Sequence, residues 1–256
     1  MITRCTCALN GQGLQDIDPA ICVTDIRESV PAMTFAAAAN ARRDGSRLLR
    51  AQRQSLSVRI TFEIHEYDAA RRKAIAVRAC DWAREGFLTV SDRPGQRLYA
   101  VCDQLPAIPS ALQWTDQLTV GFTAYALPYW QDAVPIRAAF RGTAGETCLI
   151  PGGTAPCFLE AKIEAAEGTV NAMTVAVNGR AYRFADLNLQ KGQAFEIGYE
   201  DGSQRQFMRI GDRSALRCRT ADSADDLPLL PRTRNNIAVT ADGPVNAQFY
   251  GRGLYQ

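Results

Sequence analysis

The residue types that most often carry nucleophilic, acid–base or metal chemistry are few in this chain, which has one histidine, His65, and eight cysteines. His65 falls on the polar side of an alternating segment, and no Gly-x-Ser-x-Gly or comparable motif accompanies it. A catalytic histidine needs a nucleophile and an orienting acid beside it, and the sequence places neither there. We therefore expect His65 to be a solvated or hydrogen-bonded strand residue.

The cysteines form no Cys-x-x-Cys pair. Cys5 and Cys7 would lie on one face of a strand and could begin a zinc site, but no second pair follows at zinc spacing. We expect no bound metal, reduced thiols, and cysteines that behave as small buried hydrophobic residues. The eight are Cys5, Cys7, Cys22, Cys80, Cys102, Cys148, Cys157 and Cys218.

No cofactor motif is present either. Gly11-x-Gly13 lacks the third glycine and the following helix of a dinucleotide-binding loop, and no phosphate-binding P-loop exists. With 27 acidic residues in the chain, a carboxylate pair for glycoside hydrolysis cannot be singled out. Five aromatic residues on predicted strands could stack on a sugar ring, although we favour a core role for them. They are Tyr182, Phe184, Phe195, Tyr199 and Phe207.

Composition bounds the class of protein. The 256 residues are 46% hydrophobic, enough for one large or two ordinary domains with a sizeable core. A net charge of +2 gives no argument for general nucleic-acid binding. No apolar run approaches the roughly 20 residues of a membrane span, so we expect no membrane insertion. Met1 to Leu9 alternates instead of forming a signal peptide, and we expect the chain to be used without Sec export.

The clearest elements lie between residues 55 and 86. Ser55 to Glu66 alternates with period two and predicts a strand. Asp68 is a good N-cap for a helix over 68–85 with Gly86 as its C-cap. Apolar residues on one face of this helix (Ile75, Ala79 and Trp82, with Val77 nearby) predict that it packs on a sheet. Its arginines are expected mostly on the far side: Arg71, Arg72, Arg78 and Arg84.

A second arginine cluster precedes that strand. Residues 32–50 predict a long irregular excursion with a loop tip or hairpin turn at Asp44-Gly45, and they include Arg42, Arg43, Arg47 and Arg50. Arginine is the preferred residue for ion pairs between subunits. Both arginine clusters are therefore our candidates for subunit interfaces, and the alternative is a solvated surface.

The second half predicts a β-sandwich. Seven short alternating runs between residues 134 and 210 are separated by turns, of which Asn178-Gly179 is a strong hairpin signal. A closing hairpin over 236–251, turned at Asp242-Gly243-Pro244, follows. We divide the chain into a first domain over 1–131, a sandwich over 132–234 and closing strands over 235–256.

The order of these elements resembles the distal tail protein family of long-tailed, siphovirus-type bacteriophages. The resemblance covers most of the chain and rests on structural patterns without a chemical signature. These are Ser57-Val-Arg-Ile-Thr-Phe-Glu-Ile with the helix after it, Ser91-Asp-Arg-Pro-Gly95 before Leu98-Tyr-Ala-Val101, Leu118 to Trp130 ending in Pro-Tyr-Trp, Gly153-Thr-Ala-Pro156, and Arg234-Asn-Asn-Ile-Ala-Val239. The cysteine set and the arginine-rich segment at 40–50 are not family features.

The resemblance implies a mainly β fold: an N-terminal β-sandwich with one flanking helix, similar to tail-tube proteins, and a C-terminal galectin-like β-sandwich. The last strands, 235–256, can return to the first domain in this family. The first domain would form a homo-hexameric ring that joins the tail tube protein to the tail hub or tip protein of the baseplate. Its lumen would pass the tape-measure protein and DNA, without specific binding of the DNA. The protein would be assembled in the host cytoplasm and reside in the virion tail.

Two other functions remain open. A carbohydrate-binding β-sandwich module that contacts the host surface would need an exposed aromatic platform. A hydrolase of the tail or cell wall would depend on a carboxylate pair or on His65. Because the sequence contains no catalytic motif, we expect a structural protein and not an enzyme.

Overall fold

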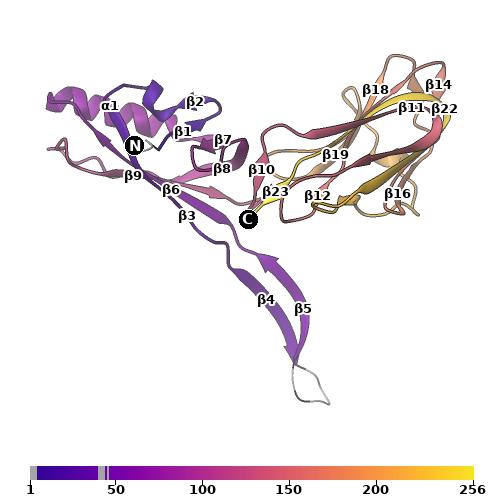
Figure 1. The fold of residues 1–256 in the computed structure, drawn as a ribbon, viewed down its shortest axis with the longest axis horizontal. Helices are drawn as coiled ribbons and strands as arrows, with labels where there is room; N and C mark the ends of the chain where they lie inside the picture. The colour runs from indigo at the N-terminus through magenta and orange to yellow at the C-terminus, as the bar shows by residue number, and fades with distance from the viewer. Residues whose placement is uncertain (1–4, 40–43, 45) are drawn as a thin grey trace. The chain divides into compact units, whose positions relative to one another are not determined.

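The structure of the chain, a computed structural model, describes residues 5–39, 44 and 46–256 (Figure 1). The chain divides into two compact units, Met1–Trp130 and Gln131–Gln256. Strands dominate both units, and the one α-helix of the described residues belongs to the first. No helix within these ranges is long and apolar enough to cross a membrane. The predicted class, mainly β with a single flanking helix, is confirmed.

The first unit is built on an antiparallel sheet with strand order β2-β1-β7-β8-β9-β6-β3. The alternation predicted around residues 55–66 is confirmed, because the five apolar side chains of β6 (Leu56–Ile64) are buried. A 3-10 turn, η1 (Leu14–Asp16), precedes β3. The other strands are β1 (Cys7–Leu9), β2 (Gln12–Gly13), β3 (Ile21–Glu28), β7 (Glu85–Val90), β8 (Gln96–Gln104) and β9 (Leu118–Ala124).

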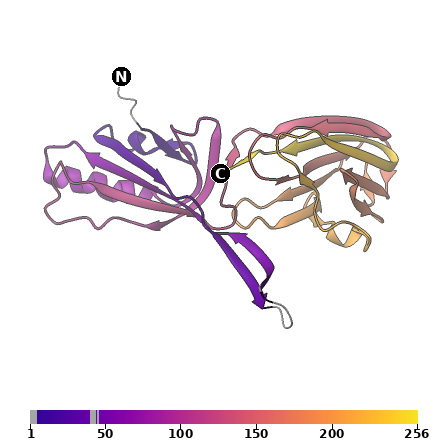
Figure 2. The ribbon, with the colours of Figure 1, turned by 60° about the horizontal axis from the view of Figure 1, so that its bottom comes forward.

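Helix α1 (Ala69–Trp82) covers the apolar face of this sheet (Figures 1 and 2). It begins at the predicted cap, where the Asp68 carboxylate accepts a hydrogen bond from the Arg71 amide at 2.7 Å. Its buried face contains the predicted Ile75, Ala79 and Trp82. The Trp82 ring packs edge-to-face on Phe122 of β9, with 6.0 Å between the centroids. Val77, in contrast, is exposed, so its predicted place near the apolar face is wrong.

The helix is shorter than the predicted 68–85, because Glu85 and Gly86 already belong to β7. Gly86 is therefore not a helix C-cap. Its φ is +150°, and a Cβ there would lie 2.2 Å from the Asn10 side-chain oxygen. Asn10 holds this strand through hydrogen bonds to the Glu85 carbonyl and the Phe87 amide, at 3.3 and 2.9 Å. The glycine is needed for this close approach of the Asn10 side chain.

The excursion predicted over 32–50 is not irregular. It forms a two-stranded antiparallel ribbon of β4 (Met33–Ala39) and β5 (Ser46–Arg53), which we call the arm. The arm follows β3 along the chain and leads into β6, so it extends away from the sheet at the end of these two paired strands (Figures 1 and 2). Asp44 lies at the predicted tip, between the two strands of the arm.

The second unit is also β-rich, with a main sheet in the order β16-β15-β22-β13-β18-β19-β20 and β11 paired to β22. The Asn178-Gly179 hairpin is confirmed, since both residues have positive φ and join the paired ends of β15 and β16. Buried side chains such as Val175, Tyr182 and Phe249 form its core. The strands of this sheet are β11 (Ile136–Leu149), β13 (Glu160–Ala165), β15 (Met173–Val177), β16 (Arg180–Phe184), β18 (Ala194–Tyr199), β19 (Gln206–Ile210), β20 (Arg213–Ser214) and β22 (Asn235–Gly251).

Short pairs complete the second unit. β12 (Cys157–Phe158) pairs with β21 (Pro228–Leu229), and β14 (Thr169–Val170) pairs with β17 (Leu189–Gln190). A 3-10 turn, η2 (Leu216–Cys218), follows β20. β10 (Trp130–Asp132) begins at the last residue of the first unit and pairs with both β8 and β23 (Leu254–Tyr255), so it is not part of the second unit alone.

The closing hairpin predicted over 236–251 is wrong, because this segment is the single strand β22. Its first half pairs with β15 and its second half with β13, while β11 runs beside both halves. Asp242-Gly243-Pro244 lies at a register irregularity opposite Gly142–Ala144, where β22 changes partner without reversing. The Asp242 carboxylate accepts hydrogen bonds from the amides of Asn171 and Ala172 there. The turn signal is thus used as a bulge, and 235–251 lie within the second unit.

Candidate subunit-contact surfaces

The arm has two different faces. Directly opposed residues of an antiparallel ladder share a face, so the register of β4 and β5 sorts their side chains. One face is mainly apolar and the other is mainly polar and basic. The apolar face carries Met33, Phe35, Ala37, Leu48 and Ala51, with Arg53 opposite Met33 at its end nearest the sheet, and the basic face carries Thr34, Ala36, Ala38, Arg47, Arg50 and Gln52.

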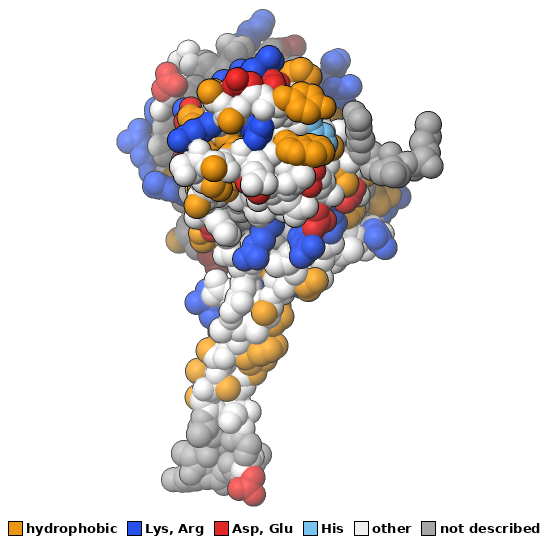
Figure 3. Space-filling model, turned by 90° about the vertical axis from the view of Figure 1, so that its left-hand side faces the viewer, with side chains coloured by type: hydrophobic (Ala, Val, Ile, Leu, Met, Phe, Trp, Pro, Cys, Tyr) orange, Lys and Arg blue, Asp and Glu red, His pale blue; other side chains and the backbone are white. Residues whose placement is uncertain are grey.

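The apolar face of the arm is open to solvent. Phe35, Leu48 and Leu49 are 62%, 57% and 61% exposed, and Leu49 is the extra residue of a bulge opposite Ala37. Figure 3 shows hydrophobic side chains along the length of the arm. A two-stranded ribbon is marginally stable by itself in water, and apolar residues gathered on one exposed face mark a contact surface. The arm is therefore the strongest candidate contact surface of the first unit.

The predicted arginine candidates separate into three groups. Arg47 and Arg50 lie exposed on β5, on the basic face of the arm, and not on an irregular loop. Arg42 and Arg43 fall outside the described residues. The helix arginines form the third group, and they differ from one another in burial and in partners.

Three arginines of this group are exposed, and one of them, Arg84, lies beyond the end of α1, so its predicted place on the helix is wrong. The Arg71 guanidinium lies 3.0 Å from the Glu66 carboxylate, and that of Arg78 lies 2.8 Å from Asp18. The Arg84 Nε donates to the Asp81 carbonyl at 2.9 Å. Their existing partners lie within the same unit, so these side chains are available to a second subunit only as parts of small charged clusters.

Arg72 does not lie on the outer face of the helix, and that prediction is wrong. Its side chain is buried and donates to three backbone carbonyls. Nε bonds Glu66 at 2.8 Å, Nη2 bonds Tyr67 at 3.0 Å, and Nη1 bonds the Leu112 carbonyl. These bonds tie the first turn of α1 to the segment before it and to the loop between β8 and β9. Arg72 thus stabilises the fold of its own subunit.

Asp18 joins the turn before β3 to the helix. Its carboxylate accepts from the Ala20 amide at 3.0 Å and from Arg78 at 2.8 Å. The backbone hydrogen bond from Ala20, followed by the Arg78 guanidinium, holds the pKa of Asp18 below its ordinary value despite burial. The carboxylate therefore stays charged, and its bond to Arg78 persists through the neutral pH range.

β3 is an edge strand of the sheet in the first unit, because it stands last in the strand order. Among the described strands β3 pairs only with β6, so its other side presents backbone groups that no described strand covers. An uncovered edge of eight residues is a ready surface for pairing with another chain. This edge lies directly before the arm in the sequence, and the two surfaces are therefore joined.

His65 has the contacts of a surface residue. Its Nε2 lies 3.1 Å from the Glu63 carboxylate, and its ring meets Trp114 edge-to-face at 6.3 Å. Hydrogen bonds from His65 and Gln117 hold the pKa of Glu63 below its ordinary value. A low carboxylate pKa does not suit a general acid, and neither contact of the ring supplies a nucleophile.

The aromatic residues considered for sugar stacking divide by burial. Tyr182, Phe184 and Phe195 are buried in the second unit, where the rings of Phe184 and Phe195 pack 4.8 Å apart. Tyr199 and Phe207 are half-buried. Most of the set therefore contributes to the core, and it does not form an exposed platform.

All eight cysteines are free thiols. Burial raises the pKa of both Cys7 and Cys157 to about 12, so these two are inert at neutral pH. Among the described residues, no group of three or more histidine, cysteine or acidic side chains is arranged to hold a metal ion.

Sequence reasoning missed the apolar residues of the arm. Phe35 precedes a run of alanines and the adjacent pair Leu48-Leu49 lies between arginines, so the segment shows no clear period. The signal that could have found them was local: two runs of seven and eight residues on either side of Asp44-Gly45, the spacing of a hairpin.

The fold of the whole chain is similar to those of phage tail proteins. No family model matches the chain, and no curated protein matches it by sequence. The SPP1 Dit protein, described as a paradigm of the hub adsorption apparatus in phages that infect Gram-positive bacteria, is 13% identical, with a TM-score of 0.69 over 97% of this chain and 98% of that chain. A chain of the phage p2 baseplate in its activated conformation with strontium is 8% identical, with a TM-score of 0.52 over 97% of each chain. This chain therefore has the Dit-type fold along nearly its full length.

Proposed function

We propose that this protein is a structural component of a phage tail tip, a distal tail protein whose first unit forms a hexameric ring. The observation that carries this proposal is the fold similarity to SPP1 Dit, which extends over 97% of the chain and so includes both units. A fold by itself does not determine function. The open arm and the uncovered β3 edge add an independent reason to expect assembly, since both are surfaces that a second chain would cover.

The ring follows from how such surfaces can be covered. A head-to-tail contact joins two different patches and closes into a ring when the rotation between subunits permits it. In our proposal the arm of one subunit lies on the next, with its apolar face removed from water. Burying Phe35, Leu48 and Leu49, each about 60% exposed, would contribute about 1–2 kcal/mol per side chain to each contact. Arg47 and Arg50 on the other face would then remain free for ion pairs.

The remaining parts of the proposal concern partners. The ring would join the tail tube to the hub or tip protein of the baseplate, and its lumen would pass the tape-measure protein and DNA. The second unit, whose galectin-like character we propose by the same resemblance, would hold other tip proteins. We propose assembly in the host cytoplasm and a final place in the virion tail. The role is structural and not enzymatic.

The ring can be tested with the purified chain. Light scattering coupled to size exclusion, together with negative-stain images, should show a closed ring of about 170 kDa, six times the 28.0 kDa of one chain. A stable monomer at high protein concentration would contradict the proposal.

Variants locate the contact. Phe35→Asp combined with Leu48→Asp should give monomers, because both residues lie on the apolar face and both charges would have to be buried between subunits. Leu216→Asp is the matched control, since Leu216 is 43% exposed on the second unit. Circular dichroism must show that each variant remains folded. If the arm variant forms rings as readily as the control does, the arm is not part of the subunit interface.

A further inference from the structure

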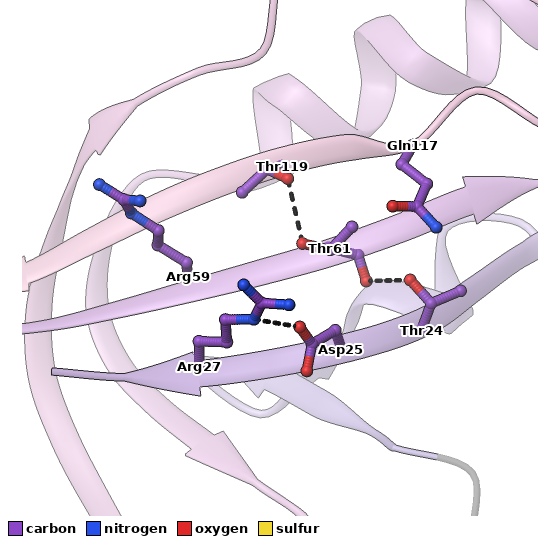
Figure 4. A pocket seen from close by; sticks show the side chains of 7 residues that line it. All are labelled: Thr24, Asp25, Arg27, Arg59, Thr61, Gln117 and Thr119. Atoms are coloured by element: carbon purple, nitrogen blue, oxygen red, sulfur yellow. Dashed lines mark hydrogen bonds and ion pairs between the residues drawn. The ribbon is translucent and has the colours of Figure 1, made fainter.

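The polar face of the first unit's sheet contains a cavity of about 490 Å³ that neither the arm nor the helix explains. It spreads over β3, β6 and the start of β9, on the side opposite α1 (Figure 4). Its lining is almost wholly polar or charged: Thr24, Asp25, Arg27, Arg59, Thr61, Gln117 and Thr119.

Two arginines dominate this cavity. Arg27 of β3 and Arg59 of β6 are directly opposed in the antiparallel ladder, so their side chains leave the sheet on the same face. Like charges in this position repel and destabilise the pair. β9, which pairs with the other side of β6, places Gly121 opposite Arg59. Glycine has no side chain that could neutralise the charge of Arg59.

The two charges are only partly compensated. Arg27 Nε bonds the Asp25 carboxylate at 2.5 Å, as Figure 4 shows. Arg59 is exposed and has no hydrogen bond or ion pair to any other residue in the described part of the chain. Two guanidinium groups against one carboxylate leave one net positive charge in the lining of the cavity. An anion bound there would reduce the repulsion between the arginines.

The same cavity that Arg27 and Arg59 line also contains a hydroxyl group that can donate a hydrogen bond. Thr61 Oγ1 and Thr119 Oγ1 lie 3.0 Å apart, so one of these hydroxyls donates its proton to the other. The accepting hydroxyl keeps its own proton free for another acceptor. The Thr24 hydroxyl is already used, because it donates to the Thr61 carbonyl. The cavity therefore offers the open N–H groups of Arg59, those remaining on Arg27, and one hydroxyl proton.

We propose that this cavity binds a phosphate-type oxyanion through Arg59 and Arg27. Guanidinium groups suit phosphate because they present pairs of donors in a plane that matches two of its oxygens. The same chemistry is offered by inorganic phosphate and by the phosphodiester backbone of a nucleic acid. The inference stands on this cavity alone and does not require the ring.

Phosphate binding to the full chain tests the site. Isothermal titration with inorganic phosphate, at constant ionic strength set with chloride, should show binding to the wild type. Arg59→Gln should weaken it about ten- to hundredfold, as expected for the loss of charge-assisted hydrogen bonds. Arg217→Gln is the matched control, because Arg217 is also exposed but lies in the second unit. Equal binding to all three proteins, or none to the wild type, would overturn the proposal.

Thermal unfolding provides a second measurement that does not depend on heats of binding. Phosphate should raise the Tm of the wild type and of Arg217→Gln and leave that of Arg59→Gln unchanged. Arg59→Gln should fold normally, since Arg59 is exposed and the change removes a repulsion. Acetate at the same ionic strength should have no such effect. An acetate effect equal to that of phosphate would indicate a site for acidic protein segments and would refute the oxyanion assignment.

The source of the phosphate is decided by a short DNA duplex with a fluorescent label. If the phosphodiester backbone is the ligand, anisotropy should show salt-dependent binding that weakens in Arg59→Gln by the same factor as phosphate binding. If free phosphate is the ligand, DNA binding should be equal in the wild type and the variant. Either result supports the site, provided that the phosphate titration shows the predicted loss.

Discussion

Replacing Arg72 with methionine tests whether this arginine serves the fold or a subunit contact. Methionine retains much of the apolar stem and removes the guanidinium, which is buried and donates to the carbonyls of Glu66, Tyr67 and Leu112. Hydrogen bonds from a charged group contribute about 1.5–3 kcal/mol each. Water can reach the half-buried Glu66 and the exposed Tyr67, whereas Leu112 is buried. We expect a net loss of about 3–5 kcal/mol, a large part of the roughly 5–15 kcal/mol that stabilises a domain.

Tryptophan fluorescence makes the measurement specific to one unit. All three tryptophans, Trp82, Trp114 and Trp130, belong to the first unit. Urea unfolding followed by fluorescence therefore reports the first unit, and far-ultraviolet circular dichroism reports both units together. The two signals should separate in Arg72→Met, with the fluorescence transition at lower urea concentration.

Arg71→Met is the matched control, because Arg71 is the neighbouring residue and its side chain is 63% exposed beside Glu66. An exposed ion pair contributes about 0–1 kcal/mol, so this variant should unfold almost as the wild type does. If the two variants lose equal stability, the three carbonyl bonds do not stabilise the unit as we argue. If Arg72→Met keeps its stability but no longer assembles, Arg72 belongs to an interface.

Other residues give further predictions. Asn235→Ala should lower the free energy of unfolding, measured in urea, by about 2–4 kcal/mol, because the buried Asn235 side-chain amide is hydrogen-bonded to four backbone groups and to a second asparagine. The control Asn236→Ala should lower it little, and equal losses in the two variants would contradict this prediction. Cys7 and Cys157 should resist iodoacetamide at pH 8 and react only after unfolding, since a pKa of about 12 leaves roughly one thiolate in ten thousand; labelling of the native chain at either position would refute it. The Ala20 amide and the Arg78 guanidinium lower the pKa of Asp18 in the folded chain. Ionised Asp18 therefore contributes its full stabilisation above the pKa of the unfolded chain, near 4, and loses it as pH falls through the lower pKa of the folded chain. In Asp18→Asn this part of the acid-induced loss of stability should be absent, and identical pH profiles would exclude it.

Elements with strong local signals were predicted well. The period-two pattern from Leu56 to Ile64, the Asp68 cap with the apolar stripe of α1, and the Asn178-Gly179 turn all appear in the structure. Each depends on residues within about one turn or one strand of one another, and so the sequence alone contains the whole cause.

Features that depend on distant partners were not predictable in the same way. Asp242-Gly243-Pro244 has the composition of a turn, but β11 runs beside both halves of β22 and keeps it a single strand. The alanines of β4 hide the alternation that would have predicted the two strands of the arm. Arg27 and Arg59 repel each other only because the register of β3 against β6 places them opposite one another. Each of these outcomes is set by pairing between segments far apart in the chain.

By itself, the sequence determined that this is a mainly β protein with one amphipathic helix and no recognisable catalytic motif, because periodicity and turn chemistry are local properties. Only the tertiary structure decided which arginines are available to a partner. Arg72 is buried because the loop between β8 and β9 brings the Leu112 carbonyl to it, whereas Arg47 and Arg59 stay exposed because no described segment covers them. Burial depends on what folds over a side chain, and no local pattern around these arginines specifies that.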